Sequence, residues 1–353
     1  MIKRKATRLI KVGKVNIGNN APISVQSMTK TDTRDVRSTI NQIQSLESIG
    51  CEIVRLAVPD REAGGSLLEI KKLVSVPLIA DIHFDWRIAL MAIDAGIDGL
   101  RINPGNIGAS WKIKEVVSLS RQKGIPIRIG VNAGSLQKDI LHKYGHPTPQ
   151  AIVESAERHM EILQELDFHD FKVSLKASDV MMTIKAYRLF SERHDYPLHI
   201  GISEAGPSYT GIIKSSVGLG ILLYEGIGDT MRVSLTSSPE EEVRTAFMIL
   251  RALGLREPSA DIISCPTCGR CQVDIKPLAR QVEEELKDIK TPIKVAVMGC
   301  AVNGPGEARE ADLGIACGKG EGFLFKNGKI IKSFKEDDLL KGFLEELSVF
   351  KNK

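Results

Sequence analysis

A short apolar run, a polar turn and an amphipathic stretch recur in that order up to about residue 255. The amphipathic stretches, such as VRSTINQIQSLESIG, repeat apolar residues at helical spacing. Several of them end in glycine, as at Gly50 and Gly124, which suits the end of a helix. The apolar runs predict buried strands over residues 23–28, 52–58, 77–82, 97–103, 126–132, 170–176, 198–203 and 230–236. The alternation predicts an α/β protein with a parallel sheet.

The number of repeated units favours a closed (β/α)8 barrel, the TIM barrel. Eight strand–helix units over about 230 residues match the size of that fold. A doubly wound open sheet is the alternative, but no G-x-G-x-x-G motif follows the first predicted strand. We therefore expect a TIM barrel over residues 1–255.

The pattern changes after residue 255. The segment REPSAD reads as a linker, and shorter predicted strands follow it, with helices predicted over 275–289 and 336–350. The dipeptide Asn327-Gly328 is typical of a two-residue hairpin turn. We expect residues 256–353 to form a smaller α+β domain.

The composition is that of a globular protein with a substantial core, with 42% apolar and 26% charged residues. The net charge of +4 is too small to indicate a nucleic-acid or membrane surface. The basic N-terminal stretch lacks the apolar run of a signal peptide, and no segment reaches the roughly 18 apolar residues of a spanning helix. We expect a cytoplasmic protein, in which clustered cysteines more often serve metal binding or catalysis than disulfides.

Polar residues gather where the predicted barrel strands end, the position at which TIM barrels carry their chemistry. They are Arg55, Asp81, His83, Arg101, Asn103, Arg128, Asn132, Lys176, His199, Glu204, Arg232 and Ser234. The planar fork of arginine matches phosphate oxygens, so four arginines and a lysine favour a substrate with two phosphates. Any one arginine could instead balance an internal acid. Asp81 and Glu204 are the only obvious acids at this rim, and both have the chemistry for acid–base catalysis.

Four cysteines lie in the smaller domain. Cys265, Cys268 and Cys271 form a C-x-x-C-x-x-C run, and Cys300 follows in a second turn-rich segment. A zinc ribbon would be one thiolate short unless Cys271 contributes, whereas four thiolates at this spacing also suit an iron–sulfur cluster. Cys51 and Cys317 stand alone and are expected to be small buried residues.

Long motifs give the chain a family resemblance. SCPTCGR and VAVMGCAVNGPGEA, together with SVQSMTKTDTRD, ADIHFD, LRINPGN, VSLKASD and HIGISEAGP, resemble the bacterial 4-hydroxy-3-methylbut-2-en-1-yl diphosphate synthases of the non-mevalonate isoprenoid pathway. The resemblance spans essentially the whole chain. It implies a TIM barrel joined to a domain that resembles part of sulfite reductase and carries a [4Fe–4S] cluster, with Cys265, Cys268, Cys300 and Glu307 as ligands. Cys271 and Cys317 depart from the family pattern.

The resemblance also implies a reaction, the reductive opening of 2-C-methyl-D-erythritol 2,4-cyclodiphosphate. The arginines, Lys176, His83, His199, Asn103, Asn132 and Ser234 would bind the substrate. Glu204 is the first candidate for the proton donor and Asp81 the second. Flavodoxin or ferredoxin would supply electrons to a homodimer in which each cluster domain caps the partner's barrel. From the residues alone, a diphosphate-binding transferase of the dihydropteroate synthase type and a non-catalytic zinc module are the alternatives. Neither needs the VNGPGEA turn.

Overall fold

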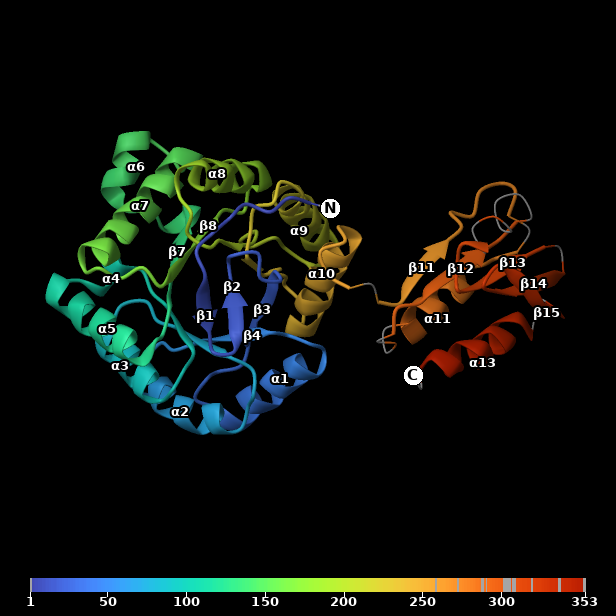
Figure 1. Ribbon diagram of the computed structural model, residues 1–353, viewed down its shortest axis with the longest axis horizontal. Coiled ribbons are helices and arrows are strands. Elements are labelled where there is room, and N and C mark those ends of the chain that lie inside the picture. The colour runs from blue at the N-terminus through green and yellow to red at the C-terminus, as the bar shows by residue number, and fades with distance from the viewer. Residues whose placement is uncertain are drawn as a thin grey trace. The chain divides into compact units, whose positions relative to one another are not determined.

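The computed structural model describes residues 2–257, 259–271, 273–286, 289, 291–300, 306, 309–318, 320–335 and 338–351. The chain divides into two compact units, Met1–Arg256 and Glu257–Lys353 (Figure 1). The division falls one residue beyond the boundary expected from the sequence. None of the helices in the described part of the chain has the length and apolar character that a membrane crossing requires.

The first unit is built around eight parallel strands, which confirms the expected TIM barrel. Their hydrogen-bonded order is β8-β7-β6-β5-β4-β3-β10-β9, and a bridge between Val173 and Leu198 brings β8 next to the segment that enters β9. The strands are β3 (Ser24–Met28), β4 (Ile53–Ala57), β5 (Leu78–Asp81), β6 (Gly99–Arg101), β7 (Ile127–Asn132), β8 (Phe171–Lys176), β9 (His199–Ile200) and β10 (Thr230–Met231).

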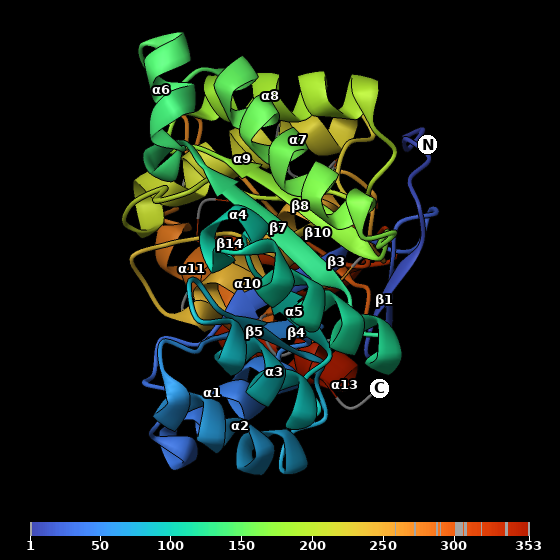
Figure 2. The ribbon, with the colours of Figure 1, turned by 90° about the vertical axis from the view of Figure 1, so that its left-hand side faces the viewer.

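Helices surround this barrel (Figures 1 and 2). They are α1 (Val36–Ser48), α2 (Arg61–Lys72), α3 (Trp86–Asp94), α4 (Pro104–Ile107), α5 (Ser110–Lys123), α6 (Lys138–Tyr144), α7 (Pro149–Glu165), α8 (Val180–Arg193), α9 (Ser208–Tyr224) and α10 (Pro239–Ala252), with a 3-10 turn at Ala133–Ser135. Side chains cap several of them. Asp60 accepts from the Ala63 amide, and Thr148 accepts from the Ala151 amide. One large apolar cluster fills the space between strands and helices.

A short N-terminal hairpin closes the amino end of the barrel. Its strands, β1 (Ile10–Val12) and β2 (Val15–Ile17), pair antiparallel. Ile10, Val12 and Ile17 pack in one cluster with Ile53 and Ile79, which lie near the amino ends of β4 and β5. Because this end is sealed with apolar side chains, the chemistry is left to the carboxyl ends of the strands.

The described part of the second unit comprises a five-stranded sheet and two helices. Its strands, in spatial order, are β11 (Asp261–Ser264), β12 (Lys294–Met298), β13 (Leu313–Cys317), β14 (Glu321–Lys326) and β15 (Lys329–Lys335). The first three run parallel and the last three antiparallel. The helices are α11 (Lys276–Leu286) and α13 (Leu339–Lys351). Asn327 and Gly328 both have positive φ angles between β14 and β15, which confirms the predicted hairpin turn.

Candidate functional site

A cavity of about 230 Å³ lies at the carboxyl ends of the barrel strands. Nine of the twelve barrel residues predicted from the sequence line it. The full lining is Arg55, Asp81, His83, Arg101, Arg128, Gly130, Asn132, Ser174, Lys176, Ser203, Arg232 and Ser234. Asp81 is the only carboxylate in this set of described residues, against four arginines and a lysine. The cavity therefore carries a large excess of positive charge.

Asp81 holds two of the arginines. Its carboxylate lies 3.2 Å from Arg101 Nη1 and 3.5 Å from Arg55 Nε, and His83 Nε2 lies 3.6 Å away. Burial opposes ionisation of Asp81, but Arg55 and Arg101 outweigh that effect and hold its pKa below the usual value. Asp81 is therefore a stable carboxylate at neutral pH and a poor source of protons.

The side chains of Arg55 and Arg101 are further fixed by uncharged neighbours. Arg55 contacts the sulfur of Met28 through Nη2, at 2.8 Å, and through Nε, at 3.1 Å. Arg101 donates from Nη2 to the Gly130 carbonyl at 3.0 Å. Burial lowers the pKa of Arg55 to about 10, so it stays a cation at neutral pH. Both guanidinium groups are thus set in place before any ligand arrives.

Arg128 and Lys176 have no ion-pair partner within 4 Å among the described residues, although both are buried. Burial lowers the pKa of each well below its usual value, and the neighbouring arginines add to that effect. Two buried cations without counter-charge are costly to the protein. The cost indicates that the cavity is built to be filled by an anion.

Glu242 is a second acid beside the cavity, which the sequence analysis missed. It lies on α10, almost fully buried, with its carboxylate 3.5 Å from Arg232 Nη2 and 3.1 Å from Lys30 Nζ. In the sequence it sits in the run Glu240–Glu242, which resembles the usual acidic first turn of a helix. Its position could have been predicted from helical spacing, because Glu242 lies on the same buried helix face as Ala246 and Ile249. Ser174, Ser203 and Gly130 were also missed.

Three predicted residues are not among those that line the cavity. The side-chain amide of Asn103 forms two hydrogen bonds with the backbone of Gly130. It donates to the Gly130 carbonyl and accepts from the Gly130 N–H, both at 2.9 Å. His199 is fully buried, and burial and the nearby Lys176 lower its pKa well below the usual value. Glu204 is exposed on the loop after β9 and has a left-handed φ of 52°.

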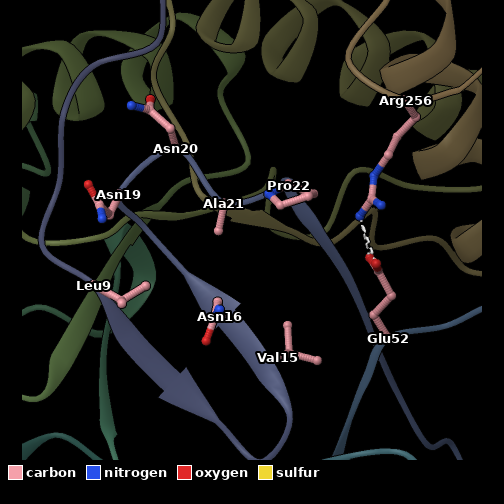
Figure 3. A pocket seen from close by; sticks show the side chains of 9 residues that line it. All are labelled: Leu9, Val15, Asn16, Asn19, Asn20, Ala21, Pro22, Glu52 and Arg256. Atoms are coloured by element: carbon pink, nitrogen blue, oxygen red, sulfur yellow. Dashed lines mark hydrogen bonds and ion pairs between the residues drawn. The ribbon is translucent and has the colours of Figure 1, made fainter.

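Another cavity, of about 510 Å³, lies at the opposite end of the barrel (Figure 3). The hairpin residues Val15 and Asn16 line it, together with Glu52 and Arg256, which form an ion pair at 2.7 Å. Arg256 also donates to the Ile23 carbonyl at 2.6 Å. Its charges are matched one to one, so this cavity lacks the unbalanced charge of the first.

In the second unit, strand pairing brings two of the predicted cluster ligands to one edge of the sheet. Cys265 directly follows β11 and donates its N–H to the Val297 carbonyl in β12 at 2.9 Å, and Cys300 follows the end of β12. The pKa of Arg270 is raised by a hydrogen bond to Cys268 and by the charges of Cys300 and Cys265. The three thiols therefore lie within electrostatic range of one guanidinium group, although among the described residues they are not gathered closely enough to form a metal site. Glu307 lies outside the described residues.

The Cys271 thiol is hydrogen-bonded to the protein backbone. It donates to the Val273 carbonyl at 3.1 Å and packs against the apolar core of the second unit. A Cβ atom at Gly299 would lie only 2.2 Å from this sulfur, so the thiol fills the space beside that glycine. Cys51 and Cys317 are buried, as expected, and burial raises the pKa of Cys51 to about 12.

Comparison with protein families and with curated proteins gives matches along both units. Residues 7–247 match the GcpE TIM-barrel domain, and residues 261–349 match the GcpE protein C-terminal domain. A protein of Thermodesulfovibrio yellowstonii, named 4-hydroxy-3-methylbut-2-en-1-yl diphosphate synthase (flavodoxin), is 64% identical over 98% of this chain and 99% of its own length. A protein of Geobacter sulfurreducens with the same name is 58% identical over 97% of each chain.

Among solved structures, a dihydropteroate synthase of Yersinia pestis in complex with a sulfonamide drug is similar to the barrel. It has a TM-score of 0.51 and 12% sequence identity, and the match covers 70% of this chain and all of that one. At that identity the likeness shows the fold alone. The matches along both units therefore do not favour the transferase or the zinc-module alternative.

Proposed function

The chain belongs to the GcpE family, and on that premise we propose that it opens 2-C-methyl-D-erythritol 2,4-cyclodiphosphate reductively. The substrate takes up two electrons and two protons and yields 4-hydroxy-3-methylbut-2-enyl diphosphate and one water. A carbon–oxygen bond to the diphosphate breaks and the ring opens, and a hydroxyl group leaves as water. The enzyme must hold a diphosphate, stabilise it as it leaves and supply a proton.

The observation that carries the proposal is the charge excess of the barrel cavity. Among the residues that the structure describes, Arg128 and Lys176 have no ion-pair partner, and the diphosphate would supply their counter-charges. Arg55, Arg101 and Arg232 line the same cavity. Asp81 already orients the first two, so they can meet the phosphate oxygens without rearrangement. Charge that develops on the diphosphate oxygen as the ring opens is then met by fixed cations, which lowers the barrier. Asn132 and Ser234 would orient the remaining oxygens.

The residues of the second unit suit a [4Fe–4S] cluster, with Cys265, Cys268, Cys300 and Glu307 as its ligands. The positions of Cys265 and Cys300 after the neighbouring strands β11 and β12 support this ligand set, and the hydrogen bond of Cys271 to the Val273 carbonyl supports leaving it out. A carboxylate is a harder and more labile ligand than a thiolate, so a Glu ligand can yield its place where a fourth thiolate would not. When bound, the cluster supplies the two electrons one at a time.

Glu204 is the proposed proton donor for the departing hydroxyl. Arg55 and Arg101 keep Asp81 ionised, which argues against Asp81 in that role. Glu204 follows β9 at the carboxyl end of the barrel, and its left-handed φ of 52° costs about 1 kcal/mol for a residue with a side chain. Backbone strain of this kind collects at functional sites, which supports a role for this loop.

Flavodoxin is the proposed electron donor, since the names of the relatives include it, and ferredoxin would serve the same step.

We also propose a homodimer in which the cluster domain of one subunit covers the barrel of the other. Large apolar side chains are exposed near the carboxyl ends of the strands. Phe84 is 73% exposed, Tyr209 80% and Met181 50%, which suits a surface that another domain covers. A fully active monomer in sedimentation and assay would overturn this arrangement.

The first test is the iron, zinc and acid-labile sulfide content of the chain purified without oxygen. The proposal predicts about four irons and four sulfides per chain. About one zinc and no sulfide would make the cysteines structural and would remove the source of electrons. The proposed reaction could not then proceed.

A further inference from the structure

Glu242 is a buried acid that the proposed reaction does not use. Its side chain is only 2% exposed, although it belongs to the first turn of α10, where acidic residues usually face solvent. Removing a carboxylate from water is costly unless partners satisfy it. Its partners therefore indicate what it does.

The carboxylate of Glu242 joins the segment after the first barrel strand to the segment after the last. Its Oε1 accepts from the Leu235 N–H at 3.0 Å and lies 3.1 Å from Lys30 Nζ. Its Oε2 accepts from Ser27 Oγ at 3.4 Å. Lys30 Nζ in turn donates to the Leu235 carbonyl at 3.0 Å. Ser27 lies in β3 and Leu235 follows β10, so these bonds connect the first and the last barrel strands of the chain, which are neighbours in the sheet.

The same carboxylate also faces the guanidinium group of Arg232. Its Oε2 lies 3.5 Å from Arg232 Nη2, and Nη1 of that arginine lies 3.5 Å from the sulfur of Met28. Arg232 also lines the cavity. Its guanidinium group is therefore held on one side by Glu242 and presented to the cavity on the other. Asp81, at the end of β5, serves Arg55 and Arg101 in the same way.

We propose that Glu242 is a positioning residue, which aims Arg232 at the anion and fixes the chain after β10. The inference rests on the proposed function for the identity of that anion, a diphosphate. The simpler alternative is that Glu242 only balances the charge of Arg232 and Lys30. The two roles have opposite consequences for anion binding, and that difference makes the inference testable.

Charge balance alone predicts that removing the carboxylate strengthens anion binding. Glu242→Gln keeps the shape of the side chain and removes one negative charge beside the cavity, so the positive potential there rises. Positioning predicts the reverse, because Arg232 loses the partner that orients it. Glu242→Asp distinguishes the two roles in a second way. It keeps the negative charge but moves the carboxylate away from Arg232, because the aspartate side chain is shorter by one methylene group.

The experiment measures the dissociation constant of inorganic diphosphate by calorimetry, with the full-length chain purified without oxygen. We expect Glu242→Gln to weaken binding about tenfold, as the loss of a hydrogen bond between charged groups commonly does. Glu242→Asp should weaken it as well. Glu240→Gln is the matched control, because it removes the same charge from the same helical turn but contacts Ser45. It should leave the dissociation constant within about twofold.

A double-mutant cycle with Arg232 completes the test. If Glu242 acts through Arg232, Glu242→Gln should weaken binding in the wild-type background and not in Arg232→Gln. Tighter or unchanged binding by Glu242→Gln, or an equal loss in both backgrounds, would overturn the inference. A Glu242→Gln chain that fails to fold leaves the Glu242→Asp result to decide, with unchanged binding as the contrary outcome. If the wild-type chain does not bind diphosphate, the proposed anion site fails and the inference fails with it.

Discussion

The guanidinium group of Arg101 packs directly against the backbone of Gly130. Its Nη2 donates to the Gly130 carbonyl at 3.0 Å, and a Cβ atom built on Gly130 would lie 2.7 Å from its Nε. The arginine is buried and is also held by Asp81, so it cannot move aside without losing a partner. The absence of a side chain at Gly130 is therefore what lets Arg101 occupy its place in the cavity.

Gly130→Ala should displace Arg101 and lower kcat/KM about tenfold or more, because small displacements of catalytic groups have large effects on rate. Gly65→Ala is the control, since a Cβ atom there would meet nothing within 4 Å apart from its chain neighbours and the backbone of its own helix. Gly65 lies in α2, where alanine is favoured by about 1 kcal/mol, so the control should be at least as stable and equally active. Unchanged kinetics for Gly130→Ala would show that Arg101 does not need its observed position.

Arg128→Met should make the ligand-free protein more stable and inactive. Arg128 is buried and has no ion-pair partner in the described ranges of the chain. Replacing it with an apolar side chain removes its desolvation cost, and we expect the free energy of unfolding to rise by about 1–2 kcal/mol. Inorganic diphosphate should raise the Tm of the wild-type chain and leave that of the variant unchanged. Arg87→Met, at an exposed ion pair with Asp85, should change neither property by much. A destabilised Arg128→Met that still binds diphosphate would contradict this account.

His159 should make the barrel less stable in mild acid. Burial lowers its pKa to about 4, with Arg101 adding to that effect, and its Nδ1 accepts from the Gly105 N–H at 3.0 Å. The unfolded chain takes up a proton near pH 6.5, so stability is lost as pH falls from about 6.5 to 4, by about 3 kcal/mol in total. Urea unfolding of wild type and His159→Gln at several pH values measures this loss. The advantage of wild type should shrink across that range, and a constant difference would contradict the assignment.

The proposed cluster ligands give contrasting predictions. Cys300→Ser should lose iron and sulfide, whereas Cys271→Ser should keep both, because the Cys271 thiol is engaged by the Val273 carbonyl. Glu307→Gln should retain much of its iron and lose turnover. Iron and sulfide analysis with the absorbance spectrum separates these variants without relying on activity. Normal turnover by Glu307→Gln together with cluster loss in Cys271→Ser would reverse the ligand assignment.

The sequence predicted the barrel because its strands are buried on both faces and are therefore nearly continuous apolar runs. It missed the hairpin β1–β2, whose strands of three residues are too short for a periodic signal. The last two barrel strands were predicted too long. Pairing stops at Ile200 and Met231, after which the chain enters loops that carry Ser203 and Ser234 to the cavity.

The lining of the cavity was predicted well where a strand presents a charged side chain at its carboxyl end, as at Arg55 and Lys176. It was predicted less well where the outcome depends on contacts between elements. The side chain of Asn103 is hydrogen-bonded to the backbone of Gly130, and His199 is buried too deeply to line the cavity. Glu242 reaches Arg232 from a helix. Such pairings arise from tertiary packing, which spacing along one strand does not reveal.

The most direct test of the account is conversion of the cyclodiphosphate by the oxygen-free chain with reduced flavodoxin. The measurement follows product formed and electrons consumed in the same sample. The account predicts 4-hydroxy-3-methylbut-2-enyl diphosphate, with about two electrons consumed per product, and no product without the reductant. A chain that carries iron and sulfide, accepts electrons from flavodoxin and still leaves the cyclodiphosphate unchanged would contradict it.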